Sequence, residues 1–388
     1  MNKNISKELI KIFKLNLNFK KLSLHEPPTT KDDLHNIKKC ISTNHIALGT
    51  FINKFEKKIS AFTKSKYVVA TNSGTSALHI SCLLLGVRKN DEVLVPSFTF
   101  VATANVIKYC NAIPHFIDIE EKNFGINILK LETYLKENTV IKNNVCFNKK
   151  TKRVIRGIIP VHIFGHPIQI DKLVSLAKKY KLFVIEDGAE SLGSTYKKKH
   201  AGTFGDIGIL SFNGNKIITT GAGGAILTNN RNISRKARHL IQNSKLKGYG
   251  YVHDDLGYNY RMPNINAAIG LSQLKRINVL IKKKRKIFSL YKKALTNSDF
   301  FHLVKEPKNC KSNYWLQTLL INKKYTSSVN SLVKKLNKKK IQVRPGWKLL
   351  PKLNHFKKSP SMNLSISKNI TKRIINIPSS SFLLNYFK

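Results

Sequence analysis

The stretch YVVATNSGTSALHISCLLLGVRKNDEVLVP, residues 67–96, decides the fold class of this chain. It begins with a short apolar run typical of a buried strand, over 67–71. Residues 74–87 then carry apolar side chains at helical spacing, and residues 91–96 form a second apolar run. A strand, a helix and a strand in such close succession predict two parallel strands joined by a crossover helix.

The same alternation continues outward from this stretch. Apolar, β-branched runs over 113–119, 156–161, 182–185, 207–212 and 224–228 predict further strands, and residues 101–110 and 170–180 have helical spacing. Residues 146–153 are polar and are expected to form a surface loop. The pattern predicts an α/β fold with a mostly parallel sheet covered by helices.

The character of the sequence changes beyond Pro263. A long helical pattern runs from there to Tyr291, with the lysine-rich run 282–286 interpreted as its solvated side. Strands over 301–304 and 314–321 and a helix over 329–339 follow. We therefore expect an N-terminal extension at 1–29, a large α/β domain at 30–275 and a small C-terminal α+β domain at 276–388.

The composition limits the classes of function. The chain has 388 residues, and 69 basic against 21 acidic side chains give a net charge of +48. Lysine is enriched together with Asn and Ile along the whole chain, and no Arg-rich strip interleaved with aromatics occurs. A solvated basic surface is therefore the favoured interpretation, and nucleic-acid binding is the weaker alternative. The sequence has no apolar run long enough to span a membrane.

Cysteines and the N-terminus indicate the compartment. The five cysteines are scattered and odd in number, which favours a reducing cytosol over a disulfide framework, and Cys82 and Cys110 are expected in the core. Lysines interrupt every apolar stretch before residue 22, so no signal peptide is predicted. Leu9, Ile10 and Phe13 would form one face of a short docking helix, with a role at a membrane surface as the alternative.

Three segments contain residues suited to chemistry. Asn72-Ser73-Gly74-Thr75-Ser76-Ala77 lies between a strand and a helix, where free N–H groups suit a phosphate, although an ordinary helix cap fits equally well. Val184-Ile185-Glu186-Asp187-Gly188-Ala189-Glu190 ends a strand with carboxylates, where α/β folds bind ligands, although Asp187 could simply cap a turn. Lys216 follows the strand 207–212 among glycines, where an amine can become a nucleophile.

Pyridoxal phosphate needs a lysine, a carboxylate and phosphate donors together. The chain resembles the DegT/DnrJ/EryC1/StrS family of sugar aminotransferases, which are pyridoxal-phosphate enzymes of fold type I. The resemblance rests on NSGTSALH, VPSFTFVATAN, PVHIFGHP, VIEDGAESLGS, GTFGDIGILSFNGNK, TTGAGG and GYNYRMPNINAAIG, which run in the family's order from about residue 72 to 274. LHEP at 24–27 and IINIPSS at 374–380 resemble members of the perosamine-type and legionaminic-acid-type branch that make 4-amino sugars.

The resemblance implies a role for each matching residue. Lys216 would hold the cofactor covalently and move the proton, and Asp187 would bind the pyridine nitrogen. Phe100 would stack on the ring, and Glu190 would lie beside it. The phosphate would be held by the helix end with Gly74, Thr75 and Ser76, by Ser211, and by Asn259 of the neighbouring subunit. No metal site is predicted.

The resemblance also implies the reaction. The expected activity is transfer of the amino group of glutamate to a nucleotide-linked 4-keto-6-deoxy sugar, with a uridine nucleotide and an N-acetylated sugar preferred, for surface polysaccharide or nonulosonic-acid biosynthesis. The enzyme would be a cytoplasmic homodimer with shared sites, with no nucleic-acid partner. The alternatives are transamination of a 3-keto nucleotide sugar and a non-catalytic, regulatory member of the same fold.

Overall fold

The computed structural model describes residues 3–13, 21–248 and 250–385. Residues 1–2 and 14–20 of the predicted N-terminal extension, residue 249 and residues 386–388 of the predicted small domain lie outside the described residues.

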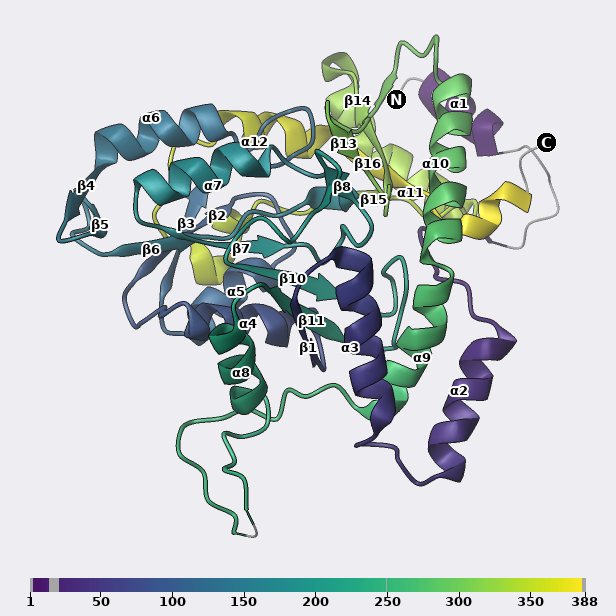
Figure 1. Cartoon of the computed structure of the whole chain (residues 1–388). Coiled ribbons are helices and arrows are strands. Elements are labelled where there is room, and N and C mark those ends of the chain that lie inside the picture. The colour runs from purple at the N-terminus through teal and green to yellow at the C-terminus, as the bar shows by residue number, and fades with distance from the viewer. Residues whose placement is uncertain (1–2, 14–20, 249, 386–388) are drawn as a thin grey trace.

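A seven-stranded sheet in the order β1-β11-β10-β7-β6-β2-β3 forms the centre of the molecule (Figure 1). Neighbouring strands are parallel from β10 through β7, β6 and β2 to β3, whereas β11 runs antiparallel to both β1 and β10. The predicted mostly parallel sheet is therefore confirmed. Its strands are β1 (Tyr67–Thr71), β2 (Glu92–Pro96), β3 (Ile113–Ile117), β6 (Ile155–Ile158), β7 (Phe183–Asp187), β10 (Ile207–Ser211) and β11 (Gly224–Thr228).

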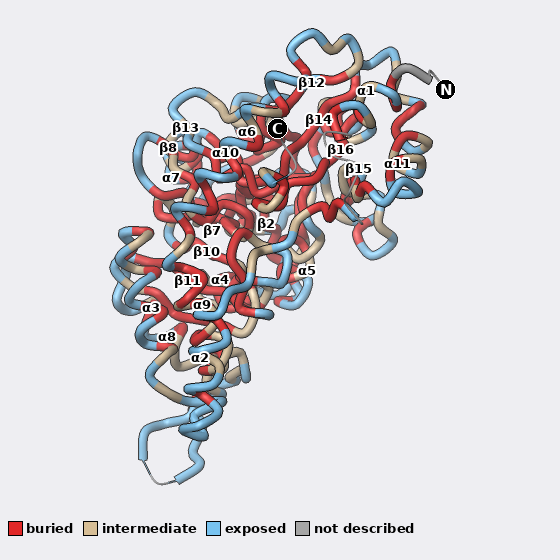
Figure 2. Tube along the Cα trace, turned by 90° about the vertical axis from the view of Figure 1, so that its right-hand side faces the viewer, coloured by how far each residue is buried: buried red, intermediate tan, exposed pale blue. Residues whose placement is uncertain are grey.

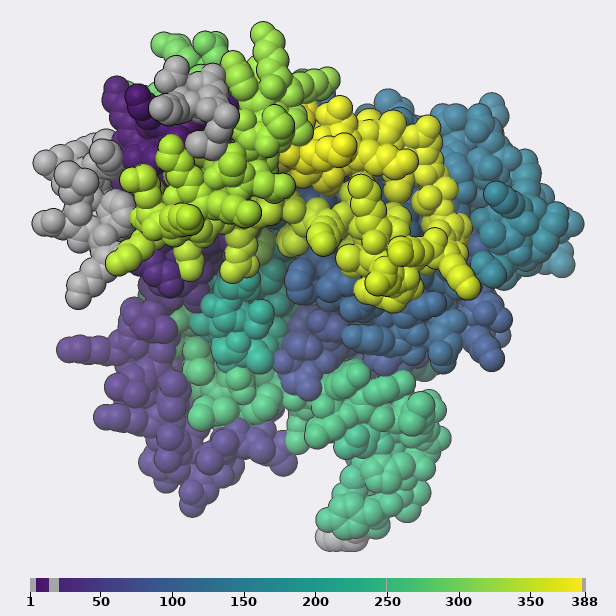
Figure 3. All heavy atoms as spheres, turned by 180° about the vertical axis from the view of Figure 1, so that it is seen from behind, coloured from purple at the N-terminus to yellow at the C-terminus, as the bar shows by residue number. Residues whose placement is uncertain are grey.

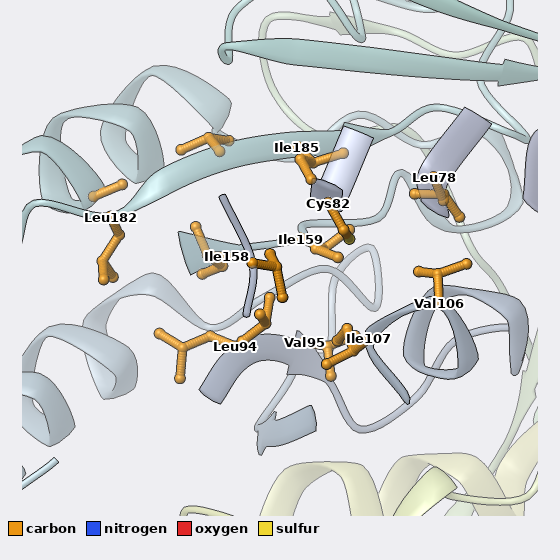
Figure 4. Close-up of a cluster of buried hydrophobic side chains, with 14 of the residues drawn as sticks. Leu78, Cys82, Leu94, Val95, Val106, Ile107, Ile158, Ile159, Leu182 and Ile185 are labelled. Carbon is orange, nitrogen blue, oxygen red and sulfur yellow. The ribbon is translucent and has the colours of Figure 1, made fainter. Parts of the chain in front are cut away.

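Helices cover both faces of this sheet. Figure 1 shows α6 and α7 on one side and α4, α5 and α8 on the other, with α3 and α9 beside β1 and β11. Their bounds are α3 (Thr50–Thr63), α4 (Gly74–Leu84), α5 (Ala102–Tyr109), α6 (Ile128–Asn138), α7 (Ile170–Lys179), α8 (Arg231–Leu240) and α9 (Asn264–Lys275). Figure 4 shows side chains of α4 and α5 gathered with those of the β2, β6 and β7 region, including Cys82. Cys82 and Cys110 are both buried, as predicted.

A second, antiparallel sheet in the order β12-β14-β16-β15 belongs to the C-terminal part of the chain. Its core includes side chains of α1, α10 and α11. Helix α10 contributes Ile277 and Leu280 to the core beside the large sheet and Ile287 and Tyr291 to the second core. The boundary at 275–276 thus stays a prediction, since this helix belongs to both cores. The elements are α10 (Ile277–Ala294), β12 (Phe301–Leu303), β14 (Gln317–Ile321), α11 (Val329–Lys338), β15 (Arg344–Pro345), α12 (Ser365–Ile370) and β16 (Ile374–Ile377).

The N-terminal helix α1 (Lys3–Phe13) packs on this second core. Leu9 is fully buried and Phe13 is 5% exposed. Figure 3 shows the dark purple N-terminal segment against the yellow-green part of the chain that contains α11, and Lys335 of α11 donates to Ser6 Oγ at 2.7 Å. The docking face is confirmed, and the protein itself covers it. The alternative role of this face at a membrane surface is therefore wrong.

The expected polar loop at 146–153 is wrong in part. β4 (Thr139–Lys142) and β5 (Val145–Asn148) form a hairpin, with Asn143 and Asn144 at φ of 49° and 59° in its turn. Asparagine tolerates this left-handed conformation better than most residues. Asn148 at the end of β5 and Thr151 beyond it both bind the buried Glu92, since Asn148 Nδ2 and Thr151 Oγ1 donate to its carboxylate at 2.9 and 2.6 Å.

The long helix after Pro263 is two helices. It breaks at Arg276, whose guanidinium donates to both carboxylate oxygens of Asp33 in α2 (Lys31–Ser42) at 3.2 and 2.9 Å. The solvated interpretation of 282–286 fails at Lys284, which is 1% exposed and donates to the carbonyl of Ser379 at 2.6 Å. Its position lies on the apolar face of α10, one turn from Leu280 and Ile281, so the helical period outweighs the local charge run.

The remaining strands are short. β8 (Thr195–Tyr196) pairs with β9 (Lys199–His200) and with β13 (Cys310–Lys311). Across the described ranges, no helix is both long enough and apolar enough to cross a membrane.

Replacing Leu9 by Ala tests the packing of α1. We expect the free energy of unfolding to fall by about 2–4 kcal/mol, because the change leaves a cavity in a closed core. Lys11 lies on the exposed side of the same helix, and Lys11→Ala serves as the control, with a change within about 0.5 kcal/mol. Urea denaturation followed by tryptophan fluorescence measures both. Equal effects of the two variants would show that α1 is not packed as described.

Candidate active site

A cavity of about 570 Å³ opens where the carboxyl ends of the large sheet meet the second sheet. Asp187 and Ser211 are the last residues of β7 and β10, and Gly74 begins the helix that follows β1. Carboxyl ends of parallel strands are where α/β folds bind ligands. The predicted site residues that line this cavity are Gly74, Thr75, Phe100, Asp187, Glu190, Ser211 and Lys216.

The N-terminus of α4 forms one end of the cavity. Ser73 caps the helix, since its Oγ accepts from the amide of Ser76 at 3.0 Å, and its carbonyl accepts from Ala77. In the described part of the chain the amides of Gly74 and Thr75 have no acceptor, which suits an anionic ligand. A Cβ on Gly74 would lie 2.9 Å from that of Ser211, so a side chain there would fill the gap between helix and strand.

Ser76 and Asn259 do not line this cavity. Ser76 is buried, and its hydroxyl donates to Asn72 Oδ1 at 2.6 Å, on the turn side of the helix. Asn259 is exposed, and only its backbone carbonyl approaches the site loop, where it accepts from Asn72 Nδ2 at 3.2 Å. Asn259 lies at the end of the exposed loop after α8, which Figure 2 shows extending away from the buried core.

Asp187 lies at the floor of the cavity. The hydroxyl of Thr103 donates to its Oδ2 at 2.8 Å, and the amide of Ala189 donates to its Oδ1 at 3.1 Å. Burial raises the pKa of Asp187 above its ordinary value, although these donors and the charge of Lys216 act in the opposite direction. A cationic group placed against this carboxylate would therefore be strongly favoured by it.

Glu190 and Lys216 lie close together in the same cavity. Lys216 Nζ lies 3.6 Å from Glu190 Oε1, and the amide of Phe164 donates to Glu190 Oε2 at 2.7 Å. Burial raises the pKa of Glu190 to about 7, while the nearby ammonium of Lys216 lowers it. This carboxyl is thus placed to exchange protons near neutral pH.

Hydrogen bonds from the C-terminal part of the chain and from the N-terminal segment hold the loop that carries Lys216. The carbonyl of Asn215 accepts from Trp315 Nε1 at 2.7 Å and from His25 Nδ1 at 2.8 Å. Lys216 Nζ lies 4.1 Å from the centroid of the Trp315 ring, in a cation–π contact. The indole of Trp315 therefore contacts both the backbone of this loop, at Asn215, and the amine of Lys216.

Sequence reasoning missed one whole wall of the cavity. This wall comes from the N-terminal segment and the C-terminal part of the chain: Leu24, His25, Trp315, Leu316, Gln342, Arg344, Pro345, Trp347 and Asn376. His25 and Asn376 lie within the LHEP and IINIPSS stretches, which the sequence singled out without giving either residue a role. Trp347 lies 6.4 Å from Phe100 between ring centroids, and Phe100 itself is 55% exposed.

An amine, a buried carboxylate and a free helix N-terminus around one cavity define a transferase site of the pyridoxal-phosphate type. The chain belongs to the DegT/DnrJ/EryC1/StrS aminotransferase family, whose model matches residues 27–385.

Two relatives are similar over nearly the whole chain. The GDP-perosamine synthase of Escherichia coli O157:H7 is 35% identical over 371 residues, which cover 94% of this chain and 95% of that protein. The UDP-4-amino-4,6-dideoxy-N-acetyl-beta-L-altrosamine transaminase of Campylobacter jejuni subsp. jejuni serotype O:23/36 (strain 81-176) is 31% identical over 352 residues, with 90% and 89% covered. The chain is thus an aminotransferase among relatives that act on nucleotide sugars.

Solved structures share the fold. The Helicobacter pylori aminotransferase PseC, involved in the biosynthesis of pseudoaminic acid, superimposes with a TM-score of 0.85 at 24% identity, over 95% of this chain and 99% of that one. The PLP-form of Spr1654 from Streptococcus pneumoniae gives a TM-score of 0.81 at 22% identity, over 95% and 98%. The predicted fold class is confirmed.

The raised pKa of Glu190 predicts a pH-dependent stability of the cofactor-free protein. Between pH 4.5 and about 7, the folded state keeps a proton that the unfolded state has lost, so stability falls as the pH rises through this window and the loss is complete above it. The loss is roughly 3 kcal/mol at about 1.4 kcal/mol per pKa unit. Glu190→Gln removes this pH-dependent loss of stability. The Tm of the variant should therefore rise relative to that of the wild type as the pH increases from 4.5 to about 7.

The exposed carboxyl of Glu132 on α6 provides the control. Thermal melts from pH 4.5 to 8.5 of the wild type, Glu190→Gln and Glu132→Gln measure the effect. A constant Tm difference between Glu190→Gln and the wild type over that range would contradict the raised pKa.

Proposed function

We propose that this enzyme transfers the amino group of glutamate to the C4 keto group of a nucleotide-linked 4-keto-6-deoxy sugar, with pyridoxal phosphate as cofactor. The observation that carries the proposal is the joining of Lys216, Asp187 and the N-terminus of α4 in one cavity. The names of the two sequence relatives support a 4-amino sugar as product. The product would enter surface polysaccharide or nonulosonic-acid biosynthesis.

The donors and acceptors of the cavity fit pyridoxal phosphate. The free amides of Gly74 and Thr75, with the Ser211 hydroxyl beside them, suit the phosphate, and Asp187 suits the protonated ring nitrogen at the floor. Phe100 presents an exposed ring to cover the planar cofactor. When bound, the cofactor supplies an electron-withdrawing ring that stabilises negative charge on the carbon next to the transferred nitrogen.

The chain's own residues handle the protons. Lys216 Nζ holds the cofactor and then carries a proton at the reacting carbon. Asp187 keeps the ring nitrogen protonated, because an opposite charge in contact favours the charged form of both groups. Glu190, 3.6 Å from Lys216, is placed to exchange a proton with that amine.

Two other functions compete with this one. A non-catalytic or regulatory member of the fold would not need Lys216 and Asp187, and both are present and face the same cavity. A 3-keto sugar would use the same protein chemistry and differ only in how its ring is held. The substrate panel below separates these alternatives.

We propose further that the active protein is a homodimer with shared sites. Exposed apolar side chains gather on the loop after α8, where Leu246, Tyr251, Val252 and Leu256 are 42%, 84%, 57% and 73% exposed. Several exposed apolar side chains on one loop favour an interface. Asn259 lies at the end of this loop with its side chain outside its own cavity, which suits a ligand for the phosphate bound by the partner.

A panel of keto sugars tests the substrate. Purified enzyme with glutamate is offered UDP-linked and GDP-linked 4-keto-6-deoxy sugars, with and without an N-acetyl group, and a 3-keto nucleotide sugar. Mass spectrometry measures the amino product. We expect a 4-amino product, with the UDP-linked N-acetylated sugar preferred. Lys216→Ala is the control and should abolish turnover. Turnover of the 3-keto sugar alone would overturn the proposal.

Mixing two weakened variants tests the shared site. Lys216→Ala keeps a good Asn259, and Asn259→Asp keeps a good Lys216 but sets a negative charge against the partner's phosphate. Their heterodimer has one site with both residues intact and one with neither. A mixture after subunit exchange should recover about a quarter of wild-type activity, since about half of its C2 dimers are heterodimers. Verified heterodimers without activity, or a monomer by light scattering, would contradict the shared site.

A further inference from the structure

The segment around His25 forms a fixed part of the cavity wall. Leu22 bridges Ile341 in parallel fashion, with hydrogen bonds from Leu22 N to Lys340 O at 2.9 Å and from Gln342 N to Leu22 O at 2.8 Å. The amide of Ser379 donates to the carbonyl of Leu24 at 2.7 Å. Backbone bonds on both sides therefore hold this segment, and the side chains of Leu24 and His25 line the cavity.

Geometry determines the tautomer of His25. Its Nδ1 lies 2.8 Å from the carbonyl oxygen of Asn215. A carbonyl oxygen only accepts, so Nδ1 carries the proton and donates. Burial, together with the positive charges of Lys284 and Lys216, lowers the pKa of His25 well below its ordinary value. The imidazole is therefore neutral, and its Nε2 carries a free lone pair.

This lone pair is available to a bound molecule. Within the described residues, no donor reaches His25 Nε2. The indole N–H of Trp315, the nearest aromatic neighbour, is already used by the carbonyl of Asn215. Because the imidazole is tied to the residue that precedes Lys216, its acceptor lies close to the amine at which the reaction occurs.

A hydrogen-bond acceptor at His25 Nε2 distinguishes the two substrates, glutamate and the keto sugar. The carboxylates of glutamate offer only lone pairs, which the lone pair of Nε2 repels, and the amino group of glutamate is itself the group that reacts. A sugar ring offers hydroxyl or amide hydrogens on the carbons beside its keto group, and these can donate to Nε2. We infer that His25 Nε2 accepts a hydrogen bond from a hydroxyl or amide group of the sugar next to the reacting carbon, and so serves the sugar half-reaction alone. The inference rests on the proposed function.

Two substitutions test the roles of His25 Nδ1 and Nε2 separately. Asparagine places an amide nitrogen where imidazole has Nδ1, so His25→Asn keeps the bond to the Asn215 carbonyl and removes the acceptor at the Nε2 position. Glutamine reaches the Nε2 position with its amide oxygen, so His25→Gln keeps an acceptor there and loses the bond to Asn215. A merely structural His25 would tolerate asparagine better than glutamine.

Single-turnover kinetics on the two half-reactions test the inference. Stopped-flow absorbance follows the cofactor-loaded enzyme with glutamate, and then the aminated enzyme with the UDP- and GDP-linked 4-keto-6-deoxy sugars. For His25→Asn we expect the glutamate half-reaction within about twofold of wild type. We expect the sugar half-reaction to lose roughly 10- to 100-fold in kcat/KM, as when a hydrogen bond to a bound group is removed. His25→Gln should fall between the wild type and His25→Asn.

The outcomes are distinguishable. An unchanged sugar half-reaction in His25→Asn, equal loss in both half-reactions, or a His25→Gln slower than His25→Asn would each overturn the inference alone. A wild-type enzyme that reacts with glutamate and with no keto sugar would refute the proposed function, and the inference with it. The absorbance of the bound cofactor, compared before each run, confirms that the variants are loaded equally.

Discussion

A fully buried carboxylate, that of Glu186, holds together the part of the fold on which the site depends. It accepts from the amides of Gly202, Phe204 and Gly205 at 2.9, 2.5 and 2.7 Å and lies 3.1 Å from His162 Nε2. Although burial raises the pKa of Glu186, the bond from His162 and these amides keep it below its ordinary value, so the group is ionised. These hydrogen bonds fix the segment between β7 and β10 to the end of β7. Successive side chains of a strand point to opposite faces of the sheet. Since the Glu186 side chain points toward the 202–205 segment, the side chain of Asp187 points the other way, toward the cavity.

The second constraint joins the site to the rest of the chain. Lys216 lies in a loop beyond the end of β10, and a loop alone does not fix an amine to the accuracy that proton transfer requires. The Asn215 carbonyl receives two donors, from segments 190 and 100 residues away in sequence. The N-terminal segment and the C-terminal sheet are therefore structural supports of the reacting amine as well as walls of the cavity. Behind them, the buried amine of Lys284 donates to the carbonyl of Ser379, whose amide holds Leu24.

The sequence predicted what depends on local pattern. The strands of the large sheet follow from their apolar period. Asp187 and Lys216 stood out because they lie at or just beyond the ends of two such strands, and the resemblance to the family gave each its role. What it could not predict depends on distant contacts. The LHEP stretch was marked by the resemblance, but nothing local gave His25 or Trp315 a role, since their roles come from one carbonyl that neither is near in sequence. The burial of Lys284 was misjudged because a run of like charges outweighed the helical period in the interpretation. The hairpin at 139–148 was missed although its two strands pair with each other around a local turn at Asn143 and Asn144.

The electrostatics of the cavity follow from one cause, which acts with opposite sign on acids and bases. Burial raises the pKa of Asp187 and Glu190 and lowers that of His25, so each shift favours the neutral form. The three groups differ in the nearby charges that could counteract the effect of burial on their pKa. Glu190 already has the ammonium of Lys216 at 3.6 Å, whereas Asp187 receives only a hydroxyl and an amide. A protonated ring nitrogen at Asp187 would supply the opposite charge that this carboxylate needs, and the stabilisation would be mutual. For His25, the charges of Lys284 and Lys216 act in the same direction as burial and lower its pKa further. The cavity thus combines one carboxylate suited to a cation, one carboxyl that titrates near neutrality and one imidazole whose free nitrogen, Nε2, is an acceptor.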